Sequence, residues 1–353
     1  LEHRSSTSLV CRRDELPHAG AEGITDEYLN FLGLASHEYF HAWNVKRIKP
    51  AAFTPYDLAR ENYTRQLWAF EGITSYYDDL ALARSGLIPP ARYLELLGRT
   101  VTTVLRTPGR HAQSVAESSF DAWIKYYRQD ENSGNAIVSY YAKGALVGCA
   151  LDLTLRRDGR ASLDDLMRAL WERYGRRDVG VPEDGIAVLA SELAGRDLTD
   201  FFARYVDGTE DPPLPELLAS FGVAFHVRAA ADAKDRGGKP GSGTPPRCTL
   251  GLRAGADRKL AFVRRDGPAA RAGLSAGDTL VAVGGLKATP ERIAAVLAQR
   301  APGDVVEVHA FRRDEFMTFA VTPAPAPDDT CWLTLAADAA PEALARRRGW
   351  LGG

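Results

Sequence analysis

Residues 37–77 read HEYFHAWNVKRIKPAAFTPYDLARENYTRQLWAFEGITSYY, and the first five follow the pattern His-Glu-x-x-His. On a helix, residues four positions apart lie on the same face, so His37 and His41 can present imidazole nitrogens to one metal ion. Glu38 can reach the open coordination position without being a ligand. Zinc lowers the pKa of bound water to about 7, and a carboxylate beside it can take the proton. The pattern therefore predicts a zinc site with Glu38 as general base.

A third ligand is needed, because two histidines on a helix can also be ordinary core or surface residues. Catalytic zinc sites use three protein ligands and leave one position open. Spacing alone offers two candidates, Glu61 at twenty positions after His41 and Glu71 at thirty. The neighbours of Glu71 are largely apolar, which argues against a merely solvated side chain. Spacing alone therefore leaves both glutamates as candidates for the third ligand.

Residues 67–77, LWAFEGITSYY, resemble the third-ligand helix of the gluzincin aminopeptidases, with a Trp, then Glu-Gly, then Ser-Tyr. This resemblance implies that Glu71 is the third ligand and that Glu61 is a carboxylate on a helix face. The segment from His37 to Leu87 is similar to the glycyl aminopeptidase family, and the similarity extends through most of the chain, including FFARYVDGTEDPPLPELL at 201–218.

The resemblance implies a mainly α thermolysin-like (gluzincin) catalytic domain followed by a small β-rich PDZ-like domain, with one Zn²⁺ per chain. It also implies peptide substrates and removal of small N-terminal residues such as Gly or Ala. The corresponding boundaries are a catalytic domain over 1–228, a linker or mobile loop over 229–247, a PDZ-like domain over 248–325 and a C-terminal tail over 326–353. Residues 229–247 are rich in Gly, Pro, Ala and charge, as a linker would be.

Two further residues take roles from the resemblance. The segment Tyr141-Ala-Lys-Gly-Ala is similar to the Tyr-x-Lys-Gly-Ala segment of gluzincin aminopeptidases, which implies that the Tyr141 hydroxyl stabilises the oxyanion. Because Tyr140 is adjacent, the resemblance leaves open which of the two tyrosines corresponds to the family's tyrosine. Leu1-Glu2-His3-Arg4 resembles the end of the family's Gly-Gly-Leu-Glu-His strand, which implies that Glu2 binds the substrate α-amino group. Fraying is the alternative expectation for a residue at the start of a chain.

Hydrophobic patterning predicts helices over about 25–43, 58–84, 90–106, 137–157, 162–174, 184–194 and 198–205. After the linker we expect strands at 249–252, 259–263, 279–283, 305–311 and 317–321, with a helix at about 290–299. Residues 266–278, DGPAARAGLSAGD, resemble the helix-and-turn signature of bacterial PDZ domains. Leu250, Gly251 and Leu252 are similar to the carboxylate-binding loop and following strand, which implies a site for a peptide C-terminus. The alternative is a structural appendage whose groove binds nothing.

Composition excludes little but is consistent with these expectations. The 353 residues carry a formal net charge of −2, which gives no reason to expect nucleic acid as a partner. The scattered cysteines exclude a local cysteine zinc site, and no apolar run is long enough for a transmembrane segment. The first residues carry no signal peptide, and we expect a fragment that lacks the family's N-terminal β domain. The compartment stays undecided between cytoplasm and periplasm.

Two other functions stay open at this point. A zinc endopeptidase is favoured if Glu2 does not face the metal, since the ion pair with the substrate amine distinguishes the two classes. A non-catalytic PDZ-containing peptide-binding protein is the second alternative. The complete set of His37, Glu38, His41, Glu71 and Tyr141 argues against it, because an inactive relative would often lose at least one of them.

Overall fold

Helix α1 (Asp26–Phe40) carries the His-Glu-x-x-His pattern and starts where the sequence predicts. The computed structural model describes residues 2–20, 23–242 and 244–352, apart from the side chain of Glu2. The hydroxyl of Thr25 accepts a hydrogen bond from the amide of Tyr28 at 3.1 Å, and so satisfies one of the free amides at the helix start. The helix ends at Phe40, three residues earlier than expected, because the chain turns at His41.

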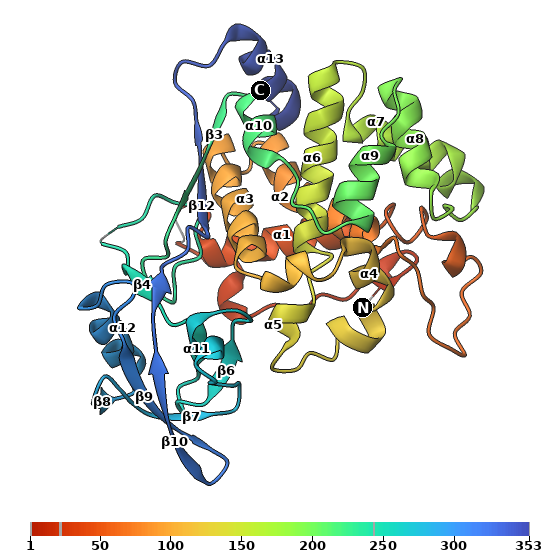
Figure 1. The fold of residues 1–353 in the computed structure, drawn as a ribbon. Coiled ribbons are helices and arrows are strands. Elements are labelled where there is room, and N and C mark those ends of the chain that lie inside the picture. The colour runs from red at the N-terminus through yellow and green to blue at the C-terminus, as the bar shows by residue number, and fades with distance from the viewer. Residues whose placement is uncertain (1, 21–22, 243, 353) are drawn as a thin grey trace.

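The helical body is formed by α1 and the segments that follow it up to residue 219. Its other α-helices are α2 (Thr74–Arg84), α3 (Pro90–Leu105), α4 (Val115–Phe120), α5 (Ser133–Ala136), α6 (Ala142–Asp158), α7 (Leu163–Arg173), α8 (Gly185–Ala194), α9 (Thr199–Phe202) and α10 (Leu214–Ala219). Short 3-10 or π-helical segments are η1 (Arg13–Glu15), η2 (Ala51–Phe53), η3 (Trp68–Ile73), η4 (Pro108–His111), η5 (Ala122–Tyr126), η6 (Gly175–Arg177) and η7 (Ala203–Asp207). Helices α2, α3 and α6 pack against one another and α1 packs on α2, in the middle of the body (Figure 1).

The strands form small antiparallel sheets. They are β1 (Glu2–His3), β2 (Ser6–Thr7), β3 (Val223–Arg228), β4 (Cys248–Thr249), β5 (Leu252–Ala254), β6 (Leu260–Val263), β7 (Thr279–Val283), β8 (Leu286–Lys287), β9 (Val306–Arg312), β10 (Glu315–Val321), β11 (Ala324–Pro325) and β12 (Thr330–Leu335). The largest has the order β10-β9-β7-β8. Strands β4–β7, β9 and β10, together with α11 (Pro268–Arg271) and α12 (Pro290–Ala298), surround a second hydrophobic core within residues 248–321. The expected mainly helical body with a small β-rich region is confirmed.

The helix predicted over 58–84 is only partly formed. Residues 57–66 are irregular, and the π-helical segment η3 begins at Trp68. Asn62 donates to the carbonyl of Asp57 at 2.9 Å and accepts from the amide of Asp57 at 3.4 Å. Such side-chain bonds give the backbone an alternative to helical pairing. Glu61 is therefore not on a helix face, contrary to expectation.

The linker and tail expected after Val227 pack against the helical body. Gly238 donates from its amide to the carbonyl of Cys331 at 2.7 Å, and a Cβ at Gly238 would meet the carbonyl oxygen of Glu95 in α3 at 2.4 Å. Strand β12 pairs with β3, and helix α13 (Pro341–Leu351) packs on α2 and α6. Trp350 of α13 is fully buried. The domain boundaries themselves stay a prediction.

Asn135 joins the helical body to the β-rich region. Its side-chain amide donates to the carbonyl of Val263 at 2.9 Å, and its carbonyl accepts from the amide of Arg265 at 2.8 Å. A Cβ at the neighbouring Gly134 would approach the ring of Phe262 to 2.8 Å, so a larger residue there would require this ring to move. The two hydrophobic cores are thus connected through α5 and β6.

Candidate metal centre

His37, His41 and Glu71 bring three donor atoms together at the junction of α1 and η3. These atoms all lie within 4.8 Å of one another. The Nε2 atoms of His37 and His41 lie 3.3 and 3.2 Å from Oε2 of Glu71. Two imidazoles and one carboxylate are the donor set of many catalytic zinc sites, and they leave a coordination position for substrate or water. The group could therefore hold a metal ion.

Both histidines use their second ring nitrogen for a hydrogen bond inside the protein. Nδ1 of His37 lies 3.2 Å from Oδ2 of Asp78 in α2, and Nδ1 of His41 lies 2.7 Å from the carbonyl oxygen of Asn44. Bonds of this kind orient the ring and favour the proton on Nδ1, so that Nε2 is the nitrogen that can bind a metal ion. The donor chemistry of the chain thus fits a divalent metal ion.

The side chain of Asn44 ties the end of α1 to the segment that carries Glu71. It donates to the carbonyl of Ala69 and to the hydroxyl of Thr74, in both cases at 3.1 Å. Sequence reasoning missed Asp78 and Asn44. Asp78 lies seven residues after Glu71, about two helical turns, so the same-face rule that paired the histidines could have found it.

The charges of the centre support one another. Burial lowers the pKa of His37, but hydrogen bonds with Asp78 and Glu71 outweigh it and raise that pKa to about 10. Burial raises the pKa of the Glu71 carboxyl, whereas hydrogen bonds with His37 and His41 dominate and keep it below its usual value. A carboxylate held in its ionised form beside two imidazoles is a cation-binding arrangement. A bound cation would displace the proton from His37.

Glu61, the competing third ligand, lies elsewhere. Its side chain is exposed and accepts a hydrogen bond of 2.5 Å from the hydroxyl of Tyr63. It does not belong to the group of donor atoms around His37. The structure therefore brings Glu71 to the histidines and leaves Glu61 outside.

Glu38 is half-buried on α1 and contacts the N-terminal hairpin. The hydroxyl of Thr7 in β2 donates to its Oε2 at 3.3 Å. In the same hairpin Thr7 pairs with the backbone of Glu2. The side chain of Glu2 lies outside the described residues, so its role as amine-binding group stays a prediction.

Tyr141, rather than Tyr140, faces the metal centre. Its ring lies 6.4 Å from that of His37, and its hydroxyl lies 3.0 Å from that of Tyr127. Tyr140 is buried and donates to the same Tyr127 hydroxyl at 3.4 Å. Burial and the charge of Glu71 raise the pKa of Tyr141, so its hydroxyl keeps its proton and can donate a hydrogen bond.

The predicted carboxylate-binding loop forms a break between two strands. Leu250 is buried, and Gly251 has φ +68, which ends β4 and separates it from β5. The strand expected over 249–252 is therefore split, because a left-handed residue interrupts the extended chain. The Gly251 amide donates to the Thr249 hydroxyl at 3.0 Å, so a carboxylate would have to replace that bond. Gly251 and Leu252 line a cavity of about 280 Å³. Binding of a peptide C-terminus here stays a prediction.

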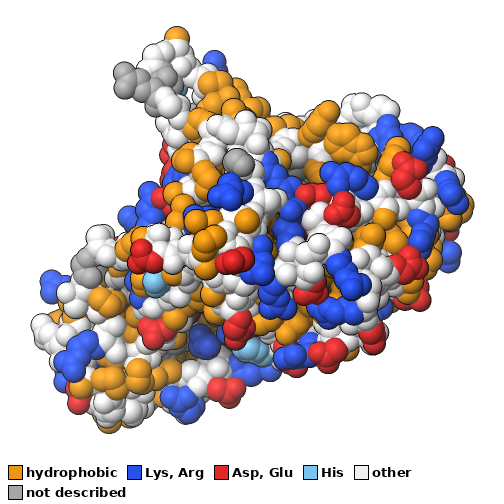
Figure 2. All heavy atoms as spheres, turned by 90° about the horizontal axis from the view of Figure 1, so that it is seen from above, with side chains coloured by type: hydrophobic (Ala, Val, Ile, Leu, Met, Phe, Trp, Pro, Cys, Tyr) orange, Lys and Arg blue, Asp and Glu red, His pale blue; other side chains and the backbone are white. Residues whose placement is uncertain are grey.

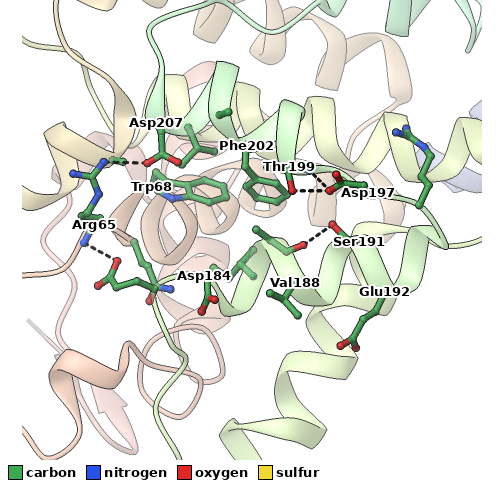
Figure 3. A pocket seen from close by; sticks show the side chains of 18 residues that line it. Arg65, Trp68, Asp184, Val188, Ser191, Glu192, Asp197, Thr199, Phe202 and Asp207 are labelled. Carbon is green, nitrogen blue, oxygen red and sulfur yellow. Dashed lines mark hydrogen bonds and ion pairs between the residues drawn. The ribbon is translucent and has the colours of Figure 1, made fainter.

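A cavity of about 580 Å³ adjoins the metal centre, since Asp78 and Tyr141 are both part of its wall. A larger one of about 870 Å³ lies on another part of the helical body (Figure 3). There Trp68 and Phe202 form an apolar floor, and exposed pairs such as Arg65–Asp207 surround it. Among the described residues that line it, none is a donor of the metal centre.

The surface gives no sign of a polyanion partner on the face drawn in Figure 2, where acidic and basic side chains are interspersed. Among the described residues no helix is long and apolar enough to cross a membrane.

Comparison with known proteins finds similarity to peptidases. Residues 30–147 match the model of the M61 glycyl aminopeptidase family, and this segment contains His37, His41, Glu71 and Tyr141. The chain is also similar to a crystal structure of an aminopeptidase N family protein from Idiomarina loihiensis, with 42% identity and a TM-score of 0.91. That match covers 100% of this chain and 60% of the other, so the chain spans about three fifths of that protein's length.

Other comparisons add little. A serine endoprotease from Yersinia pestis and the HtrA-type protease AlgW with a decapeptide match 23% of this chain, with 28% and 25% identity over 30% of each of those chains. Their TM-scores are 0.22, which supports no conclusion about fold. No curated protein matches the sequence. The PDZ assignment accordingly stays a prediction.

Proposed function

We propose that the chain is a member of the M61 glycyl aminopeptidase family, whose model matches residues 30–147, and that it is a zinc-dependent aminopeptidase that removes small N-terminal residues from peptides. The observation that carries the proposal is the convergence of two imidazole nitrogens and one carboxylate within 4.8 Å, with Glu38 next to His37 in the sequence. His37, His41 and Glu71 would hold the ion. When bound, Zn²⁺ supplies a Lewis acid that polarises the scissile carbonyl and lowers the pKa of water.

The protein's own residues carry the proton transfers and the positioning. Glu38 takes a proton from the attacking water at its carboxylate and can return it to the leaving nitrogen. The Tyr141 hydroxyl donates a hydrogen bond to the oxyanion that develops on the substrate, a contribution of about 3 kcal/mol in comparable sites. Glu2 binds the substrate's α-ammonium group, and its hairpin neighbour Thr7 orients Glu38 through the contact at 3.3 Å.

The experiment compares two glutamates that spacing could not separate. Zinc content is measured by elemental analysis for the wild type and for Glu71→Gln and Glu61→Gln. We expect about one zinc per chain in the wild type and in Glu61→Gln, and little in Glu71→Gln, because only Glu71 contacts both histidines. If the wild-type protein binds no zinc even when it is purified in the presence of zinc, the proposed zinc-dependent activity is refuted.

Activity is then measured on glycine and alanine anilides. The wild type should hydrolyse them, and Glu38→Gln should bind zinc normally yet lose at least about 100-fold in kcat, since general base catalysis contributes 10²–10⁴-fold. Cleavage of N-blocked peptides alone would favour a zinc endopeptidase instead. Bound zinc without any hydrolysis would favour a peptide-binding protein.

A further inference from the structure

The cavity of about 580 Å³ beside the metal centre has walls from α1, α2, α3 and α6. Asp78, which orients His37, and Tyr141, which faces the His37 ring, are both part of its lining. In the proposed peptidase, a group that enters this cavity would lie close to a peptide bound at the metal centre. The lining also contains Arg99, Arg106 and Arg236.

Two of the three arginines have unused hydrogen-bonding capacity. Arg106 is occupied, since it donates to the carboxylate of Asp329 at 3.2 Å, to the carbonyl of Asp235 at 2.6 Å and to the hydroxyl of Thr330 at 2.5 Å. Arg99 has a single long contact, 3.4 Å to Asp26. Arg236 is exposed and makes no hydrogen bond or ion pair with any residue that the structure describes.

The charge of Arg99 is poorly compensated. Burial, and then repulsion from Arg92, lower the pKa of its guanidinium below the usual value. Asp78 is engaged by His37, so its charge is not available to Arg99. Two more acids act on Arg99. Glu95 is shared with Arg92 and Lys239, and burial together with Asp78 raises the pKa of half-buried Asp79 well above the ordinary range. An anionic group entering the cavity would thus find unsatisfied cationic donors.

Arg236 is held at the edge of the cavity by the segment expected to be a mobile linker. Asp235 pairs with Arg228 at 2.5 Å and accepts hydrogen bonds from the amides of Ala231 at 2.9 Å and Gly237 at 3.0 Å. Gly237 and Gly238 then rest on α3 so closely that a Cβ at either would lie within 2.4 Å of a neighbouring oxygen. A loop fixed on both sides of Arg236 presents its guanidinium in a restricted region.

We propose that this cavity binds a carboxylate of the substrate on the leaving-group side of the scissile bond, through Arg236 and Arg99. The carboxylate is either the C-terminus of a short peptide or an acidic side chain near the second residue. The leaving-group side follows from charge, because the α-ammonium group of the substrate would be repelled by both arginines. The proposal names the substrate class of the proposed peptidase and rests on that function.

The first test compares matched peptides with the wild-type protein. The tripeptide Ala-Ala-Ala is compared with its C-terminal amide, and Ala-Glu-Ala amide with Ala-Gln-Ala amide. We expect at least one carboxylate form to have a KM about fivefold lower than its neutral partner, as for a partly exposed charge-assisted contact. The first pair reports the peptide C-terminus and the second an acidic side chain. Equal KM values within both pairs would overturn the proposal.

The second test uses arginine variants with a control from the same loop. Arg236→Gln and Arg99→Gln should each reduce the carboxylate preference by about threefold or more. Lys234→Gln removes the same charge two residues earlier, from an exposed side chain outside the cavity, and should keep the wild-type preference. A preference that survives in both arginine variants, while circular dichroism shows them folded, would contradict the proposed contacts.

Binding to an inactive variant separates this proposal from the proposed function. Calorimetric titration of Glu38→Gln with Ala-Ala-Ala, Ala-Glu-Ala amide and their neutral partners measures affinity without turnover. Tighter binding of a carboxylate form, lost in the double variant with Arg236→Gln, would support the cavity even if the wild type hydrolysed nothing. Equal affinity for both members of each pair would reject the cavity while leaving hydrolysis by the wild type intact.

Discussion

Asp78 is the residue on which the orientation of the first histidine depends. Its Oδ2 lies 3.2 Å from Nδ1 of His37, and its carboxyl is buried, which raises its pKa, while the His37 contact opposes that rise. The next residue, Asp79, has a similar degree of burial and no contact with either histidine among the described side chains. A comparison of these two neighbouring residues therefore separates direct contact with a ligand from mere closeness to it.

Asp78→Asn should weaken zinc affinity by about 10- to 100-fold, as outer-shell changes do in comparable sites. Asn can still accept from Nδ1–H but carries no charge to strengthen the imidazole as a ligand. Asp79→Asn is the control and should change zinc affinity by less than about threefold, because Asp79 contacts neither histidine and its raised pKa favours the uncharged form. Competition with a chelator of known affinity measures both. Equal losses in the two variants would contradict an orienting role.

Asp235 gives a pH-dependent contribution to stability. The hydrogen bond from Arg228 keeps its pKa well below the usual value in the folded protein. A lowered folded pKa stabilises the protein above the unfolded value of about 3.9, and this contribution fades as the pH falls toward the folded value. We expect Asp235→Asn to lose about 1–2 kcal/mol of unfolding free energy at pH 7.

Denaturant unfolding between pH 7 and pH 3 tests this expectation. The difference between wild type and Asp235→Asn should stay constant down to about pH 4 and shrink below it. Asp328→Asn is the control, because that side chain is exposed and makes no hydrogen bond with the described residues. A difference that grows on acidification would show that the sign is wrong.

At the level of elements, the crossing of η3 and α6 determines where Glu71 lies. Gly72 of η3 and Gly144 of α6 face one another, and a Cβ at Gly72 would lie 2.5 Å from the carbonyl carbon of Gly144. Such a close approach of two backbones is open only to glycine. Glu71 directly precedes this contact, so the distance between the two helices sets the position of the third ligand.

Gly72→Ala should separate the two segments, destabilise the protein by about 2–3 kcal/mol and weaken zinc binding. Gly148→Ala lies one turn further along α6, where a Cβ would meet Ile73 at an ordinary 3.4 Å. That variant should be neutral or slightly stabilising, because alanine has the higher helix propensity. Thermal unfolding and zinc titration measure both effects. If Gly148→Ala were destabilised and Gly72→Ala were not, the close approach of η3 and α6 at Gly72 could not be what positions Glu71.

Over the whole molecule, the C-terminal end of the chain completes the helical core. The indole of Trp350 donates to the hydroxyl of Tyr76 at 2.7 Å, and this hydroxyl donates to buried Asp152 at 2.6 Å. Arg84 donates to the carbonyl of Trp350 at 2.8 Å. The chain thus leaves the helical body, forms the β-rich region, and returns to the helix that follows Glu71.

Trp350→Ala should cost about 3–5 kcal/mol, since it empties a buried site and leaves the Tyr76 hydroxyl with one partner fewer. Trp332→Ala removes a half-buried indole that stacks on His226 at 4.8 Å and should cost only about 1–2 kcal/mol. Denaturant unfolding of the full chain compares the two. Similar losses would show that α13 contributes no more than a surface element.

The sequence by itself determined the features that depend on short separations. The same-face rule joined His37 to His41, the apolar pattern located most helices of the body, and the change in texture after Val227 marked the β-rich region. Spacing could not choose between Glu61 and Glu71, and the choice came from the resemblance of residues 67–77. Local pattern is enough in these cases because the groups involved are neighbours on one element.

Only the tertiary structure decided the features that join distant segments. It shows that residues 57–66 are irregular, that Asp78 and Asn44 orient the histidines, and that Arg236 of the expected linker lines the cavity next to the metal centre. It also shows that α13 packs against α2 and α6 of the helical core. These contacts arise from packing and hydrogen bonds between residues far apart in the chain, and the periodicity of a single element contains no information about them.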